Sequence, residues 1–370
     1  MRHRSKLPAT GLKQRQTINL TILINVVILV IIGLIMVYDS SVVQAFRDYQ
    51  DKYFYIKQQL IWVALGLSGL AFFSFFDYHF FRKLAVPFFL LSFLLLLAVF
   101  IPGLGILAGG AHRWLKIGPV TIQPTEIIKL SSIIFLSYLF EKRARLVPFL
   151  AVVIPISLII GLFQKDLGST IVFFLTALAI YIISGAQLKY FLLVGPISLL
   201  GFILFILSST YRKNRIAAFL DPFSDPQGYS YHIAQVLIAL GSGGLTGLGL
   251  GQSRQKFEYI PEVTTDSIFA IVGEEFGFLG CLVLIGLLTY LIYQGFKIAQ
   301  NAQDDFGKIL AFGLTIWLGI QSIINLAAMV ALIPLTGVPL PFISYGGSAL
   351  LANLIAVGIL LNISRSAKTN

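Results

Sequence analysis

The sequence predicts an all-α polytopic membrane protein that has about ten transmembrane helices and one long extracytoplasmic loop. Hydrophobic residues make up 57% of its 370 residues, and charged residues make up only 12%. Apolar stretches of about 18 or more residues recur from one end of the chain to the other, and each is long enough to cross a bilayer core. No polar run is long enough to form a separate soluble domain. Residues 1–370 are therefore predicted to form a single transmembrane domain.

Ten apolar runs separated by polar connections define the predicted spans. The basic tail of residues 1–16 and the basic residues of alternate connections place both termini in the cytoplasm, because lysine and arginine concentrate in cytoplasmic loops. Only residues 164–166 separate the fifth span from the sixth, and a membrane-dipping hairpin there would change the number of crossings. The spans are expected at roughly residues 17–38, 59–76, 84–102, 125–140, 147–163, 168–185, 190–209, 267–293, 309–333 and 346–363.

Charge and cysteine content exclude several classes of protein. The formal net charge is +11, but the basic residues lie in short loops between spans, so membrane topology explains them better than nucleic-acid binding does. The single cysteine, Cys281, allows neither an intramolecular disulfide nor a thiolate zinc cluster. The first apolar run lacks a small-residue cleavage site, so it is predicted to be a membrane anchor and not a cleaved signal peptide.

One connection, residues 210–266, is much longer than the others and lies on the predicted outer face. It opens with an amphipathic segment at 211–220, turns at 221–228 and continues with a predicted helix at about 231–240. Long loops in compact proteins are usually functional or disordered, and this one is too apolar and aromatic to be disordered. We therefore expect it to fold against the membrane surface. Its glycine-rich run, 241–251, lacks a nucleotide-binding pattern and is expected to form flexible or tightly turned backbone beside a bound ligand.

Asp266 lies where this loop meets the next apolar helix, and an ionisable carboxylate at a membrane boundary indicates a functional site. On a continuous helix that begins at Asp266, this residue would share one stripe with Gly277. The alternative is that Asp266 caps the helix N-terminus while Glu274 and Glu275 form structural ion pairs. Three carboxylates in the first turns of a membrane helix are too costly for capping alone. We therefore predict that Asp266 is functional, with Glu262 as a supporting residue.

Two further motifs place opposite charges close together within apolar sequence. Glu126 and Lys129 are three residues apart, so on a helix they share a face and can form an ion pair. A buried structural salt bridge explains this pair, and an alternative role for Lys129 is to keep a nearby carboxylate ionised. Lys165 and Asp166 lie between two apolar runs, where either an interfacial ion pair or a polar cavity lining explains them.

Basic residues of the long loop form another predicted group. They suit either anionic lipid headgroups or a diphosphate, because lysine and arginine bind both. The Pro- and Gly-rich segment 336–351 lies at a membrane edge, where irregular backbone is tolerated only if it is buried or lines a cavity. The basic residues of the loop are Arg212, Lys213, Arg215, Arg254 and Lys256.

Together these motifs resemble the SEDS family (shape, elongation, division and sporulation), which includes FtsW, RodA and SpoVE. The resemblance covers nearly the whole chain and rests on several independent motifs in the right order. Two runs, GLGLGQSRQKFEYIPE and PLPFISYGGSAL, resemble FtsW more than RodA. The segments that carry the resemblance are AHRW, QPTEIIKL, QKDLGST, YHIAQ, GSGGLTGLGLGQSRQK, PEVTTDSIFAIVGEEFGFLG and PLPFISYGGSALL.

The resemblance implies ten transmembrane helices in the bacterial plasma membrane. It also implies a glycosyltransferase that polymerises lipid II into peptidoglycan strands during cell division or elongation. Its expected ligands are lipid II and the nascent glycan strand. Its expected partners are a class B penicillin-binding transpeptidase and other divisome or elongasome proteins.

The matching motifs also imply roles for individual residues. Asp266 corresponds to the essential carboxylate, which we expect to act as general base. Arg113, Arg212, Arg215 and Lys256 are candidates for stabilising the departing diphosphate by their charge and placement only, and no motif assigns them. A Mg²⁺ or Mn²⁺ ion would suit that diphosphate, but no metal-ligand spacing in the sequence identifies a cofactor. The other conserved charges of the family correspond to Glu126, Lys129 and Asp166.

The chain departs from the family pattern at positions that carry none of these charges. Ser267 stands where Phe commonly follows the essential Asp, and Val236 stands where Ser often occurs. Gly110 occupies a position that is often Asn in the division branch. These departures leave the expected chemistry intact and leave substrate detail open.

Two other kinds of function share some of these features. A lipid II flippase or secondary transporter of the cell-wall pathway would also combine many helices, intramembrane charges and broken helices. A transporter places its charges near the membrane midplane, whereas Asp266, Glu126 and Lys129 lie toward one predicted face. A non-enzymatic scaffold that recruits division proteins is the third interpretation, and it leaves the polar cluster unexplained.

Overall fold

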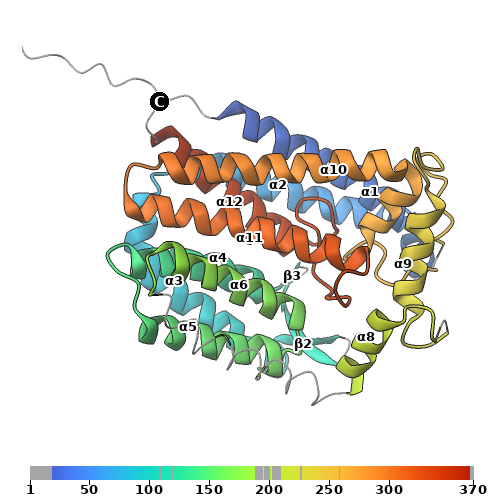
Figure 1. Ribbon diagram of the computed structural model, residues 1–370, viewed down its shortest axis with the longest axis horizontal. Coiled ribbons are helices and arrows are strands. Elements are labelled where there is room, and N and C mark those ends of the chain that lie inside the picture. The colour runs from blue at the N-terminus through green and yellow to red at the C-terminus, as the bar shows by residue number, and fades with distance from the viewer. Residues whose placement is uncertain are drawn as a thin grey trace, which may run out of the picture.

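The computed structural model describes residues 19–366 except 109, 119, 188–194, 196–200, 202–209, 226 and 258. The predicted basic tail and, apart from residues 195 and 201, the predicted span at 190–209 lie outside the described residues. Most of the described helices run side by side along the long axis of the molecule (Figure 1). They are α1 (Leu20–Tyr49), α2 (Phe54–Phe75), α3 (His79–Ala98), α4 (Pro124–Phe140), α5 (Leu146–Leu158), η1 (Ile159–Phe163), α6 (Leu167–Ile183), α8 (Thr210–Leu220), α9 (Tyr231–Ser242), α10 (Ile268–Asn301), α11 (Asp305–Met329) and α12 (Gly347–Ser366).

Seven helical segments of the described chain are long and apolar enough to cross a membrane: α1, α2, α3, the continuous α5–η1 segment, α10, α11 and α12. Helices α4 and α6 each have 17 residues, just short of that length. Every predicted span within the described residues overlaps one of these nine segments. The prediction of a mostly helical multi-span protein is therefore confirmed, whereas the predicted count of ten is not established.

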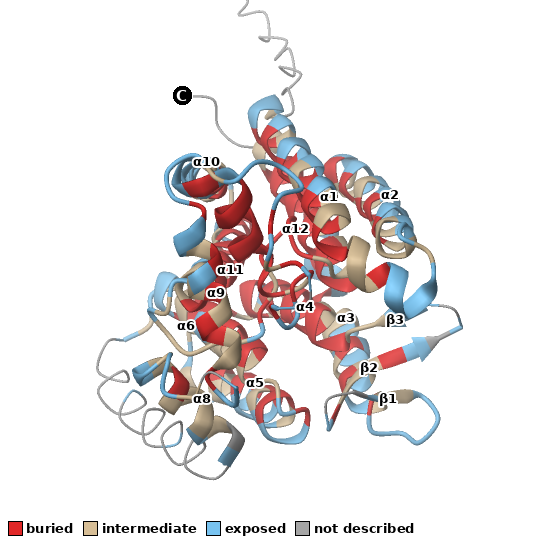
Figure 2. Ribbon diagram, turned by 90° about the vertical axis from the view of Figure 1, so that its right-hand side faces the viewer, coloured by how far each residue is buried: buried red, intermediate tan, exposed pale blue. Residues whose placement is uncertain are grey.

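Helices α11 and α12 lie at the centre of the bundle. Their most apolar windows are 72% and 78% buried within the protein, and Figure 2 shows buried residues concentrated around them. Glycines allow α2 and α12 to approach closely: a Cβ at Gly66 would lie 2.4 Å from Leu354 Cδ1, and one at Gly358 would lie 2.7 Å from the Leu70 carbonyl oxygen. Small residues give membrane helices this kind of contact, since water does not drive their association.

The two ends of the bundle differ. Helix α1 begins and α12 ends at the left-hand end in Figure 1, whereas α8, α9 and three strands lie at the opposite end. The amphipathic segment at 211–220 forms α8, and α9 confirms the helix predicted at about 231–240. We call the end that carries α8 and α9 the loop end.

A small antiparallel sheet at the loop end was not predicted. Strands β1 (Gly105–Ala108), β2 (Ala111–Ile117) and β3 (Val120–Ile122) pair in the order β1-β2-β3. The turn before β2 contains Gly110, whose φ of 71° favours glycine. The sheet holds the AHRW segment beside the first turn of α4 and so fixes the position of Arg113.

Helix α10 is broken at Gly277, which has φ 66° and ψ −165°. The stripe predicted from Asp266 to Gly277 is therefore wrong, because α10 begins two residues after Asp266 and is not continuous. The break frees the carbonyls of Glu274 and Glu275 from their usual partners four residues later. The glycine-rich run replaces those partners: Leu248 N donates to the Glu274 carbonyl (3.0 Å), and Gly249 N donates to the Glu275 carbonyl (2.9 Å).

The same run also accepts two hydrogen bonds from the far side of the break. Phe278 N donates to the Gly244 carbonyl (2.9 Å), and Leu279 N donates to the Leu245 carbonyl (3.1 Å). A Cβ on Gly277 would lie 2.4 Å from Gly247 N, so the two backbones touch. The glycine run is tightly turned, as expected. On this side it packs against the backbone of α10, where a bound ligand had been expected.

Candidate functional site

Asp266 lies at the loop end, in the segment just before α10, and its side chain is only 7% exposed. The residue at the N-cap position of α10 is Ser267, and its side chain makes no capping hydrogen bond. Capping therefore does not explain Asp266. Its carboxylate accepts a hydrogen bond from Thr265 Oγ1 at 3.3 Å, and in the described part of the chain no lysine or arginine forms a salt bridge with it.

The pKa of Asp266 is raised to about 7, chiefly by burial and also by the negative charge of Glu262. The positive charge of Arg215 and the hydrogen bond from Thr265 act in the opposite direction. A carboxyl group with a pKa near neutrality exists in both protonation states at physiological pH. It can therefore accept a proton during a reaction and release it afterwards.

The structure brings Glu262 to Asp266, as predicted. Thr265 Oγ1 donates to Asp266 Oδ1 and also lies 3.2 Å from Glu262 Oε2, so one hydroxyl group lies between the two carboxylates. Glu262 has a φ of 51°, and its carbonyl accepts from Thr265 N (3.1 Å) and Ser267 N (3.3 Å). This tight turn aims both side chains at the same region.

Two amides of α11 fix the backbone around Asp266, and neither was predicted. Asn325 Nδ2 donates to the Asp266 carbonyl (2.7 Å) and to the Val338 carbonyl (2.8 Å). One helical turn earlier, Gln321 Nε2 donates to the Pro339 carbonyl (3.1 Å). The irregular backbone predicted between α11 and α12 is thus held from inside the bundle.

Glu126 and Lys129 form a salt bridge of 2.7 Å in the first turns of α4, and their side chains are 1% and 2% exposed. Lys129 Nζ also donates to Gln321 Oε1 (3.2 Å) and lies 5.3 Å from the centre of the Trp317 ring. Gln321 and Asn325 are neighbours on one face of α11. The Glu126–Lys129 pair is therefore connected to the Asp266 backbone through α11 and not by direct contact.

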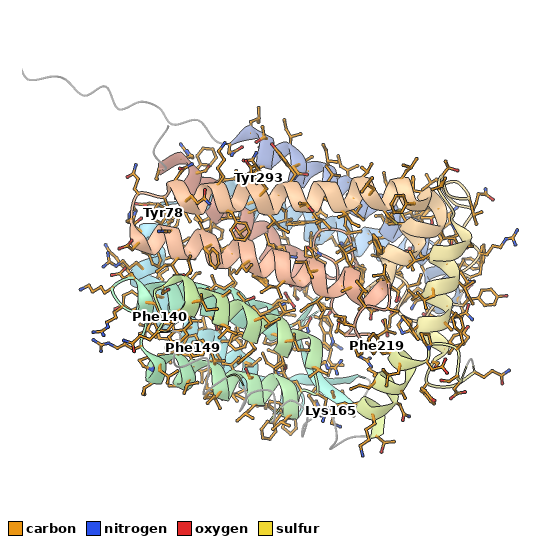
Figure 3. The ribbon with its side chains drawn as sticks, viewed as in Figure 1. Tyr78, Phe140, Phe149, Lys165, Phe219 and Tyr293 are labelled. Carbon is orange, nitrogen blue, oxygen red and sulfur yellow. The ribbon has the colours of Figure 1, made fainter. Side chains whose placement is uncertain are left out.

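Arg113, Lys165 and Asp166 lie together at the loop end, but each has a local partner. Arg113 on β2 donates to the carbonyls of Gln164 (2.9 Å) and Lys165 (2.7 Å). Lys165 Nζ donates to the Gly110 carbonyl (3.1 Å), and Figure 3 shows this side chain at the same end as Phe219 of α8. Asp166 caps α6 by accepting from Ser169 N (2.9 Å). Lys165 and Asp166 do not form a salt bridge with each other. The interfacial ion pair, one of the two explanations for these residues, is therefore not supported.

Lys256 is buried among carboxylates, which was not predicted. Its Nζ lies 2.8 Å from Asp39 Oδ1 on α1 and 3.1 Å from Glu275 Oε1 on α10. Glu274 accepts from Arg254 N (3.0 Å) and from Ser253 Oγ. We call this group, Asp39, Ser253, Lys256, Glu274 and Glu275, the buried ion cluster. Glu274 and Glu275 thus serve as structural partners, in line with one of the two alternatives.

Arg212 and Arg215 lie on α8, and Arg215 faces the Asp266 region. Arg215 Nη1 donates to the Leu335 carbonyl (2.7 Å), and its charge acts on Asp266. On α9, His232 Nε2 forms a hydrogen bond of 2.7 Å with Ser267 Oγ. The pKa of His232 is lowered to about 4, chiefly by burial and also by the charge of Arg215, so its ring is neutral at pH 7. His232 was not singled out from the sequence, although it belongs to the YHIAQ motif.

Comparison with known proteins identifies the family. The chain matches the family described as cell cycle protein, that of FtsW, RodA and SpoVE, over residues 19–369. The chain belongs to this family. It is 39% identical to the probable peptidoglycan glycosyltransferase FtsW of Geobacter sp. (strain M18), over 94% of this chain and 96% of the relative. It is 41% identical to stage V sporulation protein E of Bacillus subtilis (strain 168), over 95% of this chain and 98% of the relative.

Solved structures agree with this assignment. One, from work described as "Structural coordination of polymerization and crosslinking by a peptidoglycan synthase complex", has a TM-score of 0.78 at 26% identity and covers 94% of this chain and 98% of its own. The rod shape determining protein RodA of Thermus thermophilus has a TM-score of 0.70 at 25% identity, with 96% and 99% covered. The family predicted from the motifs is thus confirmed.

Proposed function

We propose that this chain is a peptidoglycan glycosyltransferase that polymerises lipid II into glycan strands, with Asp266 as general base. Its relatives of that name match it over nearly their whole length. The observation that carries the residue assignment is the state of Asp266: it is buried, lacks a salt bridge in the described chain and has a pKa raised to about 7. A buried charge without a partner is costly to maintain, and such residues concentrate at functional sites.

The proposed reaction joins two lipid-linked disaccharides. The 4-hydroxyl oxygen of the acceptor's terminal sugar forms a bond with the anomeric carbon of the donor, and the bond from that carbon to the diphosphate oxygen breaks. The diphosphate leaves with the bonding electron pair, the α-linkage becomes β, and the hydroxyl proton passes to Asp266. General base catalysis of this kind typically contributes about 10²–10⁴-fold to the rate.

The negative charge of the departing diphosphate must be stabilised by basic side chains at the loop end. Arg215 is close enough for its charge to act on Asp266, while Arg113 and Lys165 lie on the β2 side. Lys256 is neutralised by Asp39 and Glu275, which makes it a poor partner for a diphosphate. We therefore assign leaving-group stabilisation to Arg215 first, with Arg212 beside it on α8.

A Mg²⁺ or Mn²⁺ ion would suit this site if Glu262 held it, because a cation bound to Asp266 would lower the pKa of the group assigned as base. Glu262 lies close to Asp266, since the Thr265 hydroxyl is within hydrogen-bond distance of both carboxylates. The described residues contain no group of three His, Cys, Asp or Glu side chains that could hold a metal. Phosphate oxygens and water would have to complete the shell, as is common for magnesium. When bound, the ion would neutralise negative charge on the diphosphate.

We also propose the orientation and the partners of the protein. The short connections at the end where α1 begins and α12 ends are rich in basic residues, which favours the cytoplasm for that end and the extracytoplasmic face of the bacterial plasma membrane for the loop end. The similarity to a peptidoglycan synthase complex supports a class B penicillin-binding transpeptidase as partner, in the divisome or the elongasome. The basic residues at the cytoplasmic end include Arg82, Lys83, Lys142, Arg143, Arg145, Lys308 and Arg365.

Polymerisation of lipid II by purified protein, with and without the cognate transpeptidase, tests the proposal. Asp266→Asn should reduce the rate of glycan formation by about 10²–10⁴-fold, because the amide cannot accept the proton. The variant should remain folded, with a thermal unfolding temperature no lower than that of the wild type, and should still bind the transpeptidase. Full activity in Asp266→Asn would exclude Asp266 as the base. Movement of lipid II across vesicle membranes without glycan formation by the wild-type protein would favour the flippase instead.

A further inference from the structure

A cavity of about 280 Å³ opens at the loop end between α8, α9 and the backbone after α11. Phe219, one of its lining residues, is visible on α8 in Figure 3. The cavity differs in kind from the space of about 10 Å³ beside Lys129, which holds at most a single water molecule. Its described lining residues are Asn214, Arg215, Ala218, Phe219, Tyr229, His232, Ile233, Ile333, Pro334 and Leu335.

The lining combines an apolar wall with a few polar groups. Phe219, Ile233 and the segment 333–335 supply apolar surface, while Asn214, Tyr229 and His232 supply groups that donate or accept hydrogen bonds. This combination is typical of sites for small organic molecules, in which a few polar groups fix the orientation of the ligand. The volume lies just below the range of about 300–1,000 Å³ for such sites. It is large enough for one sugar ring but too small for a lipid-linked disaccharide with its peptide.

Three connections join the cavity to Asp266. His232, in the wall, forms its hydrogen bond with the Ser267 hydroxyl, and Ser267 follows Asp266 directly. Leu335 lines the cavity, and a Cβ on Gly337, two residues later, would lie 3.9 Å from Asp266 Oδ2. Arg215 lines the cavity and also acts electrostatically on the Asp266 carboxylate. A ligand in the cavity would therefore lie beside the group that we assign as the base.

The charge of the lining decides which part of the substrate it suits. Of the described lining residues only Arg215 carries a formal charge at pH 7, since burial keeps His232 neutral. Arg215, which we assign to the leaving group, also donates to the Leu335 carbonyl, so this one residue does not make the cavity a diphosphate site. A diphosphate requires several cations or a metal ion, which this lining lacks, whereas an uncharged polar ring with an apolar face matches it.

We propose that this cavity binds the sugar ring whose hydroxyl group attacks, that is, the terminal N-acetylated pyranose of the acceptor. Asn214, Tyr229 and His232 hydrogen-bond to its hydroxyl and acetamido groups, and Phe219 packs against its apolar face. The 4-hydroxyl then points toward Asp266, which accepts its proton as the new glycosidic bond forms. This assignment rests on the proposed glycosyltransferase function, and it adds the place where the acceptor binds.

The first test measures acceptor and donor separately in a single coupling reaction. The donor is lipid II whose 4-hydroxyl is methylated, so that it cannot act as an acceptor. The acceptor is lipid II in which a methylene group replaces the anomeric oxygen. The resulting phosphonate cannot leave, so this molecule cannot act as a donor. Ala218→Trp fills the cavity and should raise the KM for the acceptor about tenfold or more, a loss of about 1.4 kcal/mol in binding. The KM for the donor and the limiting rate at saturating acceptor should change much less.

Ala217→Trp is the matched control, because it adds the same bulk to the adjacent position of α8, which does not line the cavity. Asn214→Leu is a second variant that removes a polar group and keeps the number of side-chain heavy atoms, and it should raise the acceptor KM in the same way. An increase in the donor KM alone, or equal effects of Ala217→Trp and Ala218→Trp, would overturn the assignment.

The second test uses direct binding and separates this inference from the proposed function. Saturation-transfer NMR with the free GlcNAc–MurNAc disaccharide should detect contact with the wild-type protein in nanodiscs, and Ala218→Trp should abolish that contact. Asp266→Asn should still bind the disaccharide even though it cannot polymerise. Binding of inorganic pyrophosphate that is lost in Ala218→Trp, with no binding of disaccharide, would show that the cavity holds the leaving group and would overturn the proposal.

Discussion

Two groups of carboxylates lie on either side of the start of α10, and they differ in the partners that they bind. Glu274 and Glu275 lie inside the helix and belong to the buried ion cluster, where Glu275 binds Lys256 and both accept hydrogen bonds from backbone amides. Asp266 lies two residues before the helix, and its carboxylate accepts a long hydrogen bond of 3.3 Å from a neighbouring threonine. Both regions are buried. The difference therefore reflects the partners that the fold supplies and not access to water.

The comparison shows which carboxylates build the fold and which remain available for chemistry. Removing an ion from water is costly unless a partner charge and hydrogen bonds replace the lost hydration. Lys256 supplies that compensation to Asp39 and Glu275 together and so ties α1 to α10. Asp266 lacks comparable compensation and consequently has a raised pKa. A residue in this state adds no stability but is ready to exchange a proton.

Removal of Lys256 should have the largest effect on stability. Lys256→Met leaves Asp39 and Glu275 buried without a cation, and loss of one member of a buried ion pair typically costs about 3–5 kcal/mol. Thermal unfolding in detergent should show a large decrease in Tm. Lys213→Met is the matched control, since Lys213 is exposed on α8 and its substitution should leave Tm nearly unchanged. A stable Lys256→Met protein that has lost activity would instead assign Lys256 to the substrate.

Asp266→Asn should change stability in the opposite direction. The pKa of Asp266 is raised above its value in the unfolded chain, so folding disfavours the ionised form. This group therefore lowers stability as the pH rises from about 4 to about 7, and the full cost persists above that range. Asparagine removes the cost, which is on the order of 1–4 kcal/mol at pH 8 because each pKa unit corresponds to about 1.4 kcal/mol. The gain should vanish at pH 4, and a variant less stable than wild type at pH 8 would contradict the unpaired state of Asp266.

Gly277→Ala tests the backbone contact that places the buried ion cluster. Its φ of 66° and the approach of Gly247 N to 2.4 Å from a Cβ leave no room for a side chain. A strained backbone of this kind costs about 1–3 kcal/mol. Gly286→Ala, in the same helix with open space around its Cβ position, should be neutral or slightly stabilising. Equal unfolding temperatures for the two variants would show that the break in α10 is not required.

The pH dependence of the rate should report Asp266 directly. Because only the ionised carboxylate accepts a proton, the rate of polymerisation should rise about tenfold per pH unit below about 7 and level off above it. Stopped assays between pH 5 and 9, at saturating lipid II, would measure this profile. A rate that is constant from pH 5 to pH 8 would mean that Asp266 is either ionised throughout or not the base.

Features that depend on local sequence were predictable. The amphipathic pattern of residues 211–220 and the apolar periodicity near 231–240 correspond to α8 and α9, because helix formation there depends on neighbouring residues. Asp266 was selected from its charge at a membrane boundary, and its role stays a prediction. The three strands were missed, although residues 111–117 contain the short polar and apolar pattern of a strand between two glycine turns.

Features that depend on contacts between distant residues were not predictable. Lys256 pairs with Asp39, which is 217 positions away in the sequence, so its charge appeared available for substrate. The break at Gly277 depends on the glycine run that fills it, and a helical pattern in sequence gives no sign of such a partner. His232 and Asn325 are polar residues in apolar helices. This was the sequence feature that could have identified both as residues of the site. Their roles became visible only when α9 and α11 were placed beside the Asp266 segment.

Asn325 has a mechanical consequence. A single side-chain amide donates two hydrogen bonds that hold two separate segments of the chain, one at the Asp266 carbonyl and the other at the Val338 carbonyl. While both bonds hold, the stretch ahead of α10 and the stretch ahead of α12 must shift as one rigid body. Any widening of the loop end that admits a bulky lipid-borne sugar must therefore carry both stretches together or rupture this clamp.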